Sequence, residues 1–300
     1  MTYLSHVPSG TIVVGIDGSC PSERALGWAI IQAQLEHRPL TLLHGVDLRS
    51  IDLSGAVGLD PLVVPAALKG QGQALLSAAM RGVAKRAPGL EVITAHVPVD
   101  PREALVDAST RATMVVLGSH GRSPMKTLQL GSVSLAVSRN AECPVVVLRP
   151  QEPTTEDNGI LVGVGGERRN LPAVEFAYQQ ASFRSQPLTV MHGFWDIHGR
   201  MGLSLMSAGE AGSEDELRIV AETIAGMSEK FPDVKVSVQL RRGLVEDCLI
   251  HAGKGMGMIV IGAHPDRMAL DVLTGNPTRA LLEYAECMVA VVPSSTRSSA

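Results

Sequence analysis

The sequence predicts an α/β protein of two tandem, doubly wound domains, each built on a five-stranded parallel sheet. The chain has 300 residues, which suits two domains of ordinary size. Residues Pro39–Gly45 resemble Pro187–Gly193 at an offset of 148 residues. Residues Val115–Gly118 resemble Ile259–Gly262 at an offset of 144, so the second half is shorter after its second strand. A period this long exceeds any solenoid unit and indicates duplication of a whole domain.

The two expected domains span residues 1–150 and 159–300. Between them lies Pro150–Asn158, which is polar, contains two prolines and lacks any hydrophobic periodicity. Such composition is typical of a linker, where few contacts cross between domains.

Within the first half, short apolar runs rich in β-branched residues alternate with longer amphipathic segments, as in a parallel sheet with helical crossovers. Strands are expected at Thr11–Ile16, Leu40–Val46, Leu90–Val97, Met114–Gly118 and Val145–Leu148. Helices are expected at Ser22–His37, Ala66–Arg86, Pro101–Ser109 and Ser132–Asn140, with Ser19 and Pro21 suited to the first helix start. Ligands of such sheets bind beyond the carboxyl ends of the strands, where the strand order reverses.

Composition argues against several functional classes. The net charge of -4 and an aromatic content of 3% give little support to nucleic-acid binding. The first ten residues lack the charged and apolar regions of a signal peptide, and no apolar run is long enough to span a membrane. The four cysteines form no metal-binding or disulfide-scaffold spacing. A cytoplasmic protein with reduced thiols is therefore expected.

The strongest functional signal is the glycine-containing loop Gly118–Ser132, which follows a strand and precedes a helix. Glycines allow close approach of a ligand, and free N–H groups at a helix start favour phosphate. The Ser132 and Ser134 hydroxyls can add hydrogen bonds, and Arg122 supplies a countercharge. The loop is neither a P-loop nor a dinucleotide fingerprint. A flexible turn is the alternative interpretation.

The spacing Gly118, two residues, Gly121, nine residues, Gly131-Ser132 resembles the nucleotide loop of the universal stress protein family, G-x-x-G, nine residues, G-[ST]. The opening run Val13–Ser19 and the run Cys143–Val147 are similar to that family's first and last strands. The resemblance covers both halves and is closest to tandem-domain members common in actinobacteria. It implies bound ATP, with Mg²⁺ as an option, and an aspartate at position 17 facing the adenine. The expected site comprises Gly15, Asp17, Gly45, Gly118, Gly121, Arg122, Gly131, Ser132, Val133 and Ser134.

The halves differ in how well they match this pattern. ATP-binding members often have a glycine shortly before the third helix, where the first half has Val97–Pro101 and no glycine. The second half departs further: Pro265 replaces the second loop glycine, Asn276 replaces the serine, and Gly165 stands at the position of Asp17. Proline removes an N–H donor and cannot adopt positive φ. The second half is therefore expected to be degenerate for ATP.

Other candidates have plainer alternatives. His44 and His192 occupy equivalent positions and are interpreted as packed, hydrogen-bonded histidines rather than as bases or metal ligands. His120 lies inside the glycine loop. It has two alternative interpretations, a contact with phosphate or a side chain that faces solvent. Asp17, followed by Gly-Ser, has turn chemistry that would also suit a helix cap. The acidic residues Asp47, Asp52 and Asp60 lie in the connection after the second strand and could hold Mg²⁺ beside phosphates. Solvated carboxylates in a loop are the more common alternative.

Three functions remain open from the sequence. The first is a nucleotide-binding regulatory module in a stress or dormancy response, which the loop and the resemblance favour. The second is an interaction scaffold that no longer retains nucleotide, and the third is a slow ATPase, for which no motif positions a general base. The resemblance also implies a homodimer, or pairing of the two halves, through the last strands.

Overall fold

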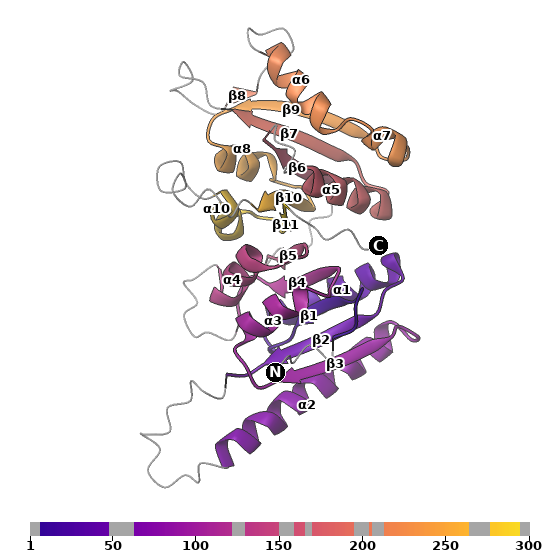
Figure 1. The fold of residues 1–300 in the computed structure, drawn as a ribbon, viewed down its shortest axis with the longest axis vertical. Coiled ribbons are helices and arrows are strands. Elements are labelled where there is room, and N and C mark those ends of the chain that lie inside the picture. Colours follow the sequence, from indigo (N-terminus) through magenta and orange to yellow (C-terminus); the bar gives the residue numbers. More distant parts are fainter. Residues whose placement is uncertain are drawn as a thin grey trace. The chain divides into compact units, whose positions relative to one another are not determined.

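The computed structural model describes residues 7–47, 63–121, 130–149, 159–165, 170–194, 204–205, 213–263 and 277–294. The chain divides into two compact units, Met1–Leu148 and Arg149–Ala300, each an α/β domain with its own strands and helices (Figure 1). This agrees with the fold class that the repeat predicts.

The first unit contains a five-stranded sheet in the order β3-β2-β1-β4-β5, and every pair in it is parallel. Its strands are β1 (Ile12–Gly15), β2 (Leu40–Gly45), β3 (Val92–Val97), β4 (Met114–Gly118) and β5 (Val145–Leu148). The central strands are covered on both faces, so Val13 and Val115 are fully buried. This burial explains why they appear in the sequence as continuous apolar runs. The direction of the chain across the sheet reverses between β1 and β4, which creates a switch point.

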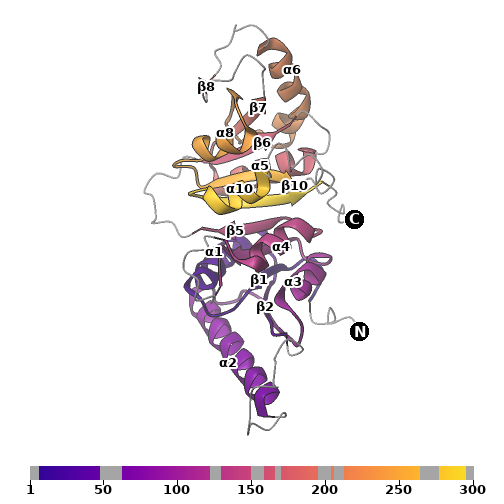
Figure 2. The same ribbon diagram turned by 90° about the vertical axis from the view of Figure 1, so that its left-hand side faces the viewer.

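Helices cover both faces of this sheet. They are α1 (Cys20–Glu36), α2 (Val63–Arg86), α3 (Pro101–Ser109) and α4 (Ser132–Asn140). Right-handed crossovers in opposite directions place α1 and α2 on one side and α3 and α4 on the other (Figure 2). The helix α1 begins two residues earlier than expected, because Ser19 caps it by accepting a hydrogen bond from the Ser22 amide.

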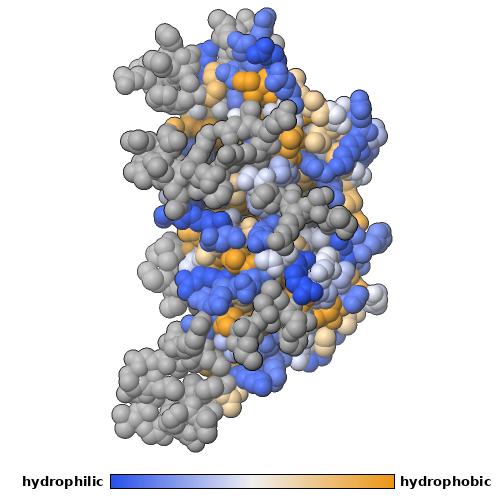
Figure 3. All heavy atoms as spheres, in the orientation of Figure 1, coloured by the Kyte–Doolittle hydropathy of each residue, from blue (hydrophilic) through white to orange (hydrophobic). Residues whose placement is uncertain are grey.

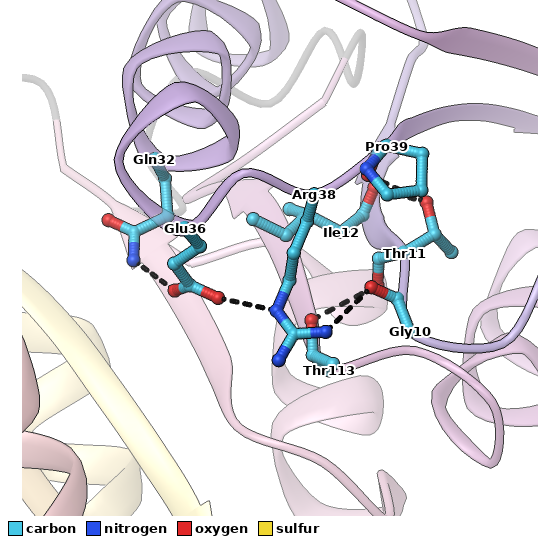
Figure 4. Close-up of polar contacts among 8 residues, drawn as sticks. All are labelled: Gly10, Thr11, Ile12, Gln32, Glu36, Arg38, Pro39 and Thr113. Atoms are coloured by element: carbon cyan, nitrogen blue, oxygen red, sulfur yellow. Dashed lines mark hydrogen bonds and ion pairs between the residues drawn. The ribbon is translucent and has the colours of Figure 1, made fainter.

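Polar contacts hold the amino ends of the central strands in register (Figure 4). The Thr11 hydroxyl donates to the Pro39 carbonyl at 3.0 Å, and Arg38 donates to the Gly10 carbonyl at 3.2 Å. Arg38 also pairs with Glu36 at 3.1 Å, which ties the end of α1 to the start of β1. Fixing these ends determines which residues meet at the opposite, carboxyl edge of the sheet.

The second unit repeats this plan with one addition. Its sheet has the order β11-β10-β6-β7-β9-β8. The strands are β6 (Ile160–Val164), β7 (Leu188–Phe194), β8 (Ser204–Leu205), β9 (Val236–Arg242), β10 (Met258–Ala263) and β11 (Met288–Pro293). The two-residue β8 is antiparallel to β9, so the expectation of five parallel strands is incomplete here. The helices are α5 (Leu171–Arg184), α6 (Ser213–Thr223), α7 (Met227–Lys230), α8 (Val245–Ala252) and α10 (Pro277–Tyr284).

No helix among the described residues is long and apolar enough to cross a membrane. On the face drawn in Figure 3, hydrophilic residues are interspersed with apolar ones over the described parts.

Candidate functional site

A cavity of about 290 Å³ opens at the carboxyl edge of the first unit's sheet, at the switch point between β1 and β4. Loops that follow β1, β2 and β4 form its rim, together with the first turns of α3 and α4. Its wall consists of Gly15, Ile16, Asp17, Ser22, Leu43, His44, Gly45, Pro101, Leu105, Leu117, Gly118, His120, Gly121, Gly131, Ser132, Val133 and Ser134. Parallel sheets bind ligands at this kind of position.

Every site residue predicted from the sequence lies in this wall except Arg122, which is outside the described residues. Sequence reasoning missed the apolar part of the cavity, formed by Ile16, Leu43, Pro101, Leu105 and Leu117. Most of these residues could have been identified from their positions in the sequence. They lie at the ends of strands or in the first turn of the following helix, and both places face the carboxyl edge of the sheet.

Close packing explains why particular wall positions are glycine. A Cβ at position 118 would lie 2.6 Å from the backbone carbon of Pro21, and one at position 45 would lie 2.8 Å from the Cα of Pro101. Neither backbone can yield without moving α1 or α3. The fold alone therefore requires glycine at these two positions.

Gly121 is different, because its neighbour is a functional group. A Cβ at position 121 would lie 2.6 Å from Oδ2 of Asp17, so any side chain there enters the cavity beside this carboxylate. The open space between Gly121 and Asp17 is thus kept by the absence of a side chain.

The start of α4 provides the hydrogen-bond donors of the site. Gly131 precedes the helix without any side-chain cap, and its own amide donates to the Ser119 carbonyl at 2.6 Å. The first-turn amides of Ser132, Val133 and Ser134 have no acceptors within the helix, and the dipole is positive at this end. Such a terminus is suited to an anion.

One hydroxyl of this turn is used within the protein. The Ser134 hydroxyl is buried and donates to the Gly118 carbonyl at 2.7 Å, so it ties α4 to the end of β4 instead of facing a ligand. The backbone amide of Ser134 remains at the helix start, and the Ser132 hydroxyl is exposed.

Asp17 does not cap α1 directly. Its Oδ1 accepts hydrogen bonds from the Ser19 amide at 2.9 Å and from the Ser19 hydroxyl at 2.6 Å. Ser19 in turn caps the helix through the Ser22 amide at 3.3 Å. Asp17 therefore orients the capping residue with one oxygen, while Oδ2 lies beside Gly121 at the cavity wall.

His44 and His192, the equivalent histidines of the two units, are packed and hydrogen-bonded, as expected. Nδ1 of His44 lies 2.6 Å from the Ile16 carbonyl, and Nδ1 of His192 lies 2.8 Å from the Val164 carbonyl. A carbonyl only accepts, so Nδ1 carries the hydrogen in both rings. His44 is also part of the cavity wall. His120 lies in the wall too, with Nδ1 3.0 Å from the Ser119 hydroxyl.

The described residues offer neither a cluster of metal ligands nor a disulfide. No group of three or more His, Cys, Asp or Glu side chains able to hold a metal occurs in the described part of the chain. Asp52 and Asp60, which the sequence offered for Mg²⁺, lie outside it. All four cysteines are free; burial raises the pKa of Cys143 and of Cys287 to about 12.

The equivalent region of the second unit is described only in part. Gly165, at the position of Asp17, is exposed and offers no carboxylate. Pro265 and Asn276 lie outside the described residues, so the predicted loss of this second site rests on the sequence.

Comparisons with known proteins agree with this architecture. A model described as "Universal stress protein family" matches residues 9–149 and again 158–293. A universal stress protein of Mycobacterium tuberculosis is 30% identical over 295 residues, covering 95% of this chain and 97% of its own. One from Mycolicibacterium smegmatis is 28% identical over 286 residues, covering 94% and 96%. In fold, a solved universal stress protein from Archaeoglobus fulgidus matches with a TM-score of 0.70 at 16% identity, covering 96% and 97%. The chain belongs to the universal stress protein family.

Proposed function

We propose that the first unit binds one adenine nucleotide, ATP, and acts as a regulatory module in a stress response. One observation carries this proposal: a single cavity joins an apolar wall to an uncapped helix start. A nucleotide has the same division, since its base is flat and largely apolar and its phosphates are anionic.

The wall residues divide accordingly. Leu43, Leu105 and Leu117 offer apolar contacts for a base, and Oδ2 of Asp17 offers an acceptor at its edge. The amides at the start of α4, next to Gly131, suit the phosphates. The volume of about 290 Å³ is at the lower end of the roughly 300–1,000 Å³ of small-molecule sites. A base with its ribose matches this size, leaving the phosphates at the mouth.

Magnesium in this proposal is held by the phosphates. The described residues contain no acidic cluster that would hold it independently. Removal of Mg²⁺ with a chelator is therefore expected to change affinity without unfolding the first unit.

Nucleotide content tests the proposal directly. We expect the purified chain, once denatured, to release one adenine nucleotide per chain, measured by chromatography. Two per chain would contradict the degeneracy of the second unit. None per chain, together with no heat of ATP binding by the stripped protein, would favour a nucleotide-free interaction scaffold.

Gly121→Glu provides the matched mutational test. The new side chain starts 2.6 Å from Oδ2 of Asp17 and places a second carboxylate in the cavity, so ATP binding should be lost. Gly70→Glu is the control, because it adds the same charge on α2 where nothing lies within 4 Å of a new Cβ. Equal ATP affinity in the two variants would contradict the assignment of the phosphate site.

A cytoplasmic location and association through a last strand, β5 or β11, also belong to this proposal. Free thiols on all four cysteines support the first. Light scattering of the purified chain measures the second, and a mass of one chain at all concentrations would contradict dimerisation.

A further inference from the structure

Two histidines face each other at the end of the first unit's sheet. The parallel register of β2 and β3 places His44 opposite His96, and their ring centroids are 5.7 Å apart. His44 keeps its Nδ1 hydrogen on the Ile16 carbonyl, which leaves Nε2 as the position that a second proton would take. Since His44 also lines the cavity, the pair connects the candidate nucleotide site to β3.

The helix α2 closes over His96 at a glycine. A Cβ at position 72 would lie 2.2 Å from Nε2 of His96 and 2.9 Å from Cδ2 of His44. From position 66 on, where the burial of α2 is described, Gly72 is the first fully buried residue, and Leu76, Ala79 and Val83 continue the buried stripe. The histidine pair thus lies where α2 first meets the sheet.

This packing suits a neutral His96 ring. Nε2 of His96 is buried and has no hydrogen-bond partner among the described residues. Burial, then the proximity of His44 and of Lys69 on α2, lowers the pKa of His96 below its ordinary value. His44 and Lys69 are the titratable neighbours that lower this pKa, and no described carboxylate raises it.

The second unit has a different arrangement at the same place. His192 lies opposite Leu240 in the register of β7 and β9, so no second histidine faces it. Its Nε2 contacts Glu216 of α6 at 2.8 Å, and its Nδ1 contacts the Val164 carbonyl at 2.8 Å. Because both nitrogens meet acceptors, a doubly protonated ring is satisfied there.

We propose that the His44–His96 pair is an acid-sensitive latch of the first unit, which releases α2 from the ends of β2 and β3 and thereby weakens nucleotide binding. A lowered histidine pKa means that the folded state binds fewer protons than the unfolded state. The stabilisation is complete above the ordinary histidine pKa of about 6.5 and is lost as the pH falls below it. The second unit carries its own counterion and lacks this response.

The effect on affinity rests on the proposed nucleotide function, whereas the release of α2 does not. Hydrogen exchange on the nucleotide-free chain measures the release, with each amide referred to its unstructured rate at the same pH. Between about pH 7.5 and about pH 5.5, on either side of the ordinary histidine pKa, we expect protection of α2 to fall and protection of α6 to persist. Unchanged α2 protection would overturn the latch, whatever the chain binds.

His96→Leu tests the coupling, since it installs the residue found at the equivalent position, Leu240. His96→Gln is a second, polar variant in case the first fails to fold, and His251→Gln removes an exposed histidine of the second unit as a control. Calorimetry with ATP at each pH gives the affinity ratio of variant to wild type, in which protonation of ATP itself cancels.

We expect this ratio to rise on acidification by up to about tenfold per pH unit, the limit for one coupled proton. The control should follow the wild type. A constant ratio, or a wild-type affinity that rises in acid because a cationic His44 attracts phosphate, would overturn the coupling. Absence of ATP binding at every pH with acid release of α2 intact would instead reject the nucleotide function alone.

Discussion

Replacing Asp17 by alanine removes two hydrogen bonds at the start of α1. Oδ1 accepts from the Ser19 amide at 2.9 Å and from the Ser19 hydroxyl at 2.6 Å, and Ser19 is the residue that caps the helix. Loss of a cap costs about 1 kcal/mol, and a net hydrogen bond to a charged group about 1.5–3 kcal/mol when shielded from water. Asp17 is half-buried, so we expect Asp17→Ala to lower the unfolding free energy of the first unit by about 1–2 kcal/mol.

The same change should also weaken nucleotide binding, because Oδ2 lies at the cavity wall beside Gly121. Asp17→Asn separates the two effects. Its amide oxygen can still accept from Ser19, while its NH₂ group replaces the acceptor at Oδ2. We therefore expect near wild-type stability and a loss of ATP affinity on the order of tenfold, equivalent to about 1.4 kcal/mol.

Hydrogen exchange of the α1 amides in stripped protein measures the stability of the first unit alone, and calorimetry measures ATP affinity. Asp107→Ala, at an exposed position on α3, controls for removal of one carboxylate. If Asp17→Asn binds ATP as the wild type does, the carboxylate is not a ligand contact. If Asp17→Ala keeps full protection of α1, the bonds to Ser19 do not stabilise the helix start.

Two further outcomes are expected. Arg149 donates hydrogen bonds to three carbonyls at the end of α10, those of Leu282, Glu283 and Ala285, at 2.8 to 3.0 Å. Arg149→Ala should therefore reduce the hydrogen-exchange protection of α10 by about 2 kcal/mol. Arg149→Lys lacks the planar guanidinium and should restore only part of this protection. Iodoacetamide at about pH 8 should alkylate the exposed Cys20 and spare Cys143 and Cys287, whose pKa is raised to about 12 by burial. Mass spectrometry counts the labels, and rapid labelling of Cys143 in folded protein would contradict its burial.

Most of the fold was predictable from the sequence because its signals are local. Strands buried on both faces appear as apolar runs, and the expected β4, α3, α4 and β5 have the bounds that the structure shows. The ends of other elements depended on contacts: β3 begins at Val92 rather than Leu90, and α2 begins at Val63 rather than Ala66. The strand β8 was not predicted, since two residues carry no periodicity.

The glycine spacing and the family resemblance selected the polar and glycine residues that line the cavity, but not its apolar wall. What the sequence could not determine is how side chains from distant segments meet. The hydrogen bond from the Ser134 hydroxyl to the Gly118 carbonyl depends on how α4 packs against β4. The pairing of His44 with His96 depends on the register of β2 and β3, and a shift of one residue would turn either ring to the opposite face. Sequence patterns thus determined which elements form and where the candidate site lies, while strand register and helix packing decided which groups line the cavity and which are used within the protein.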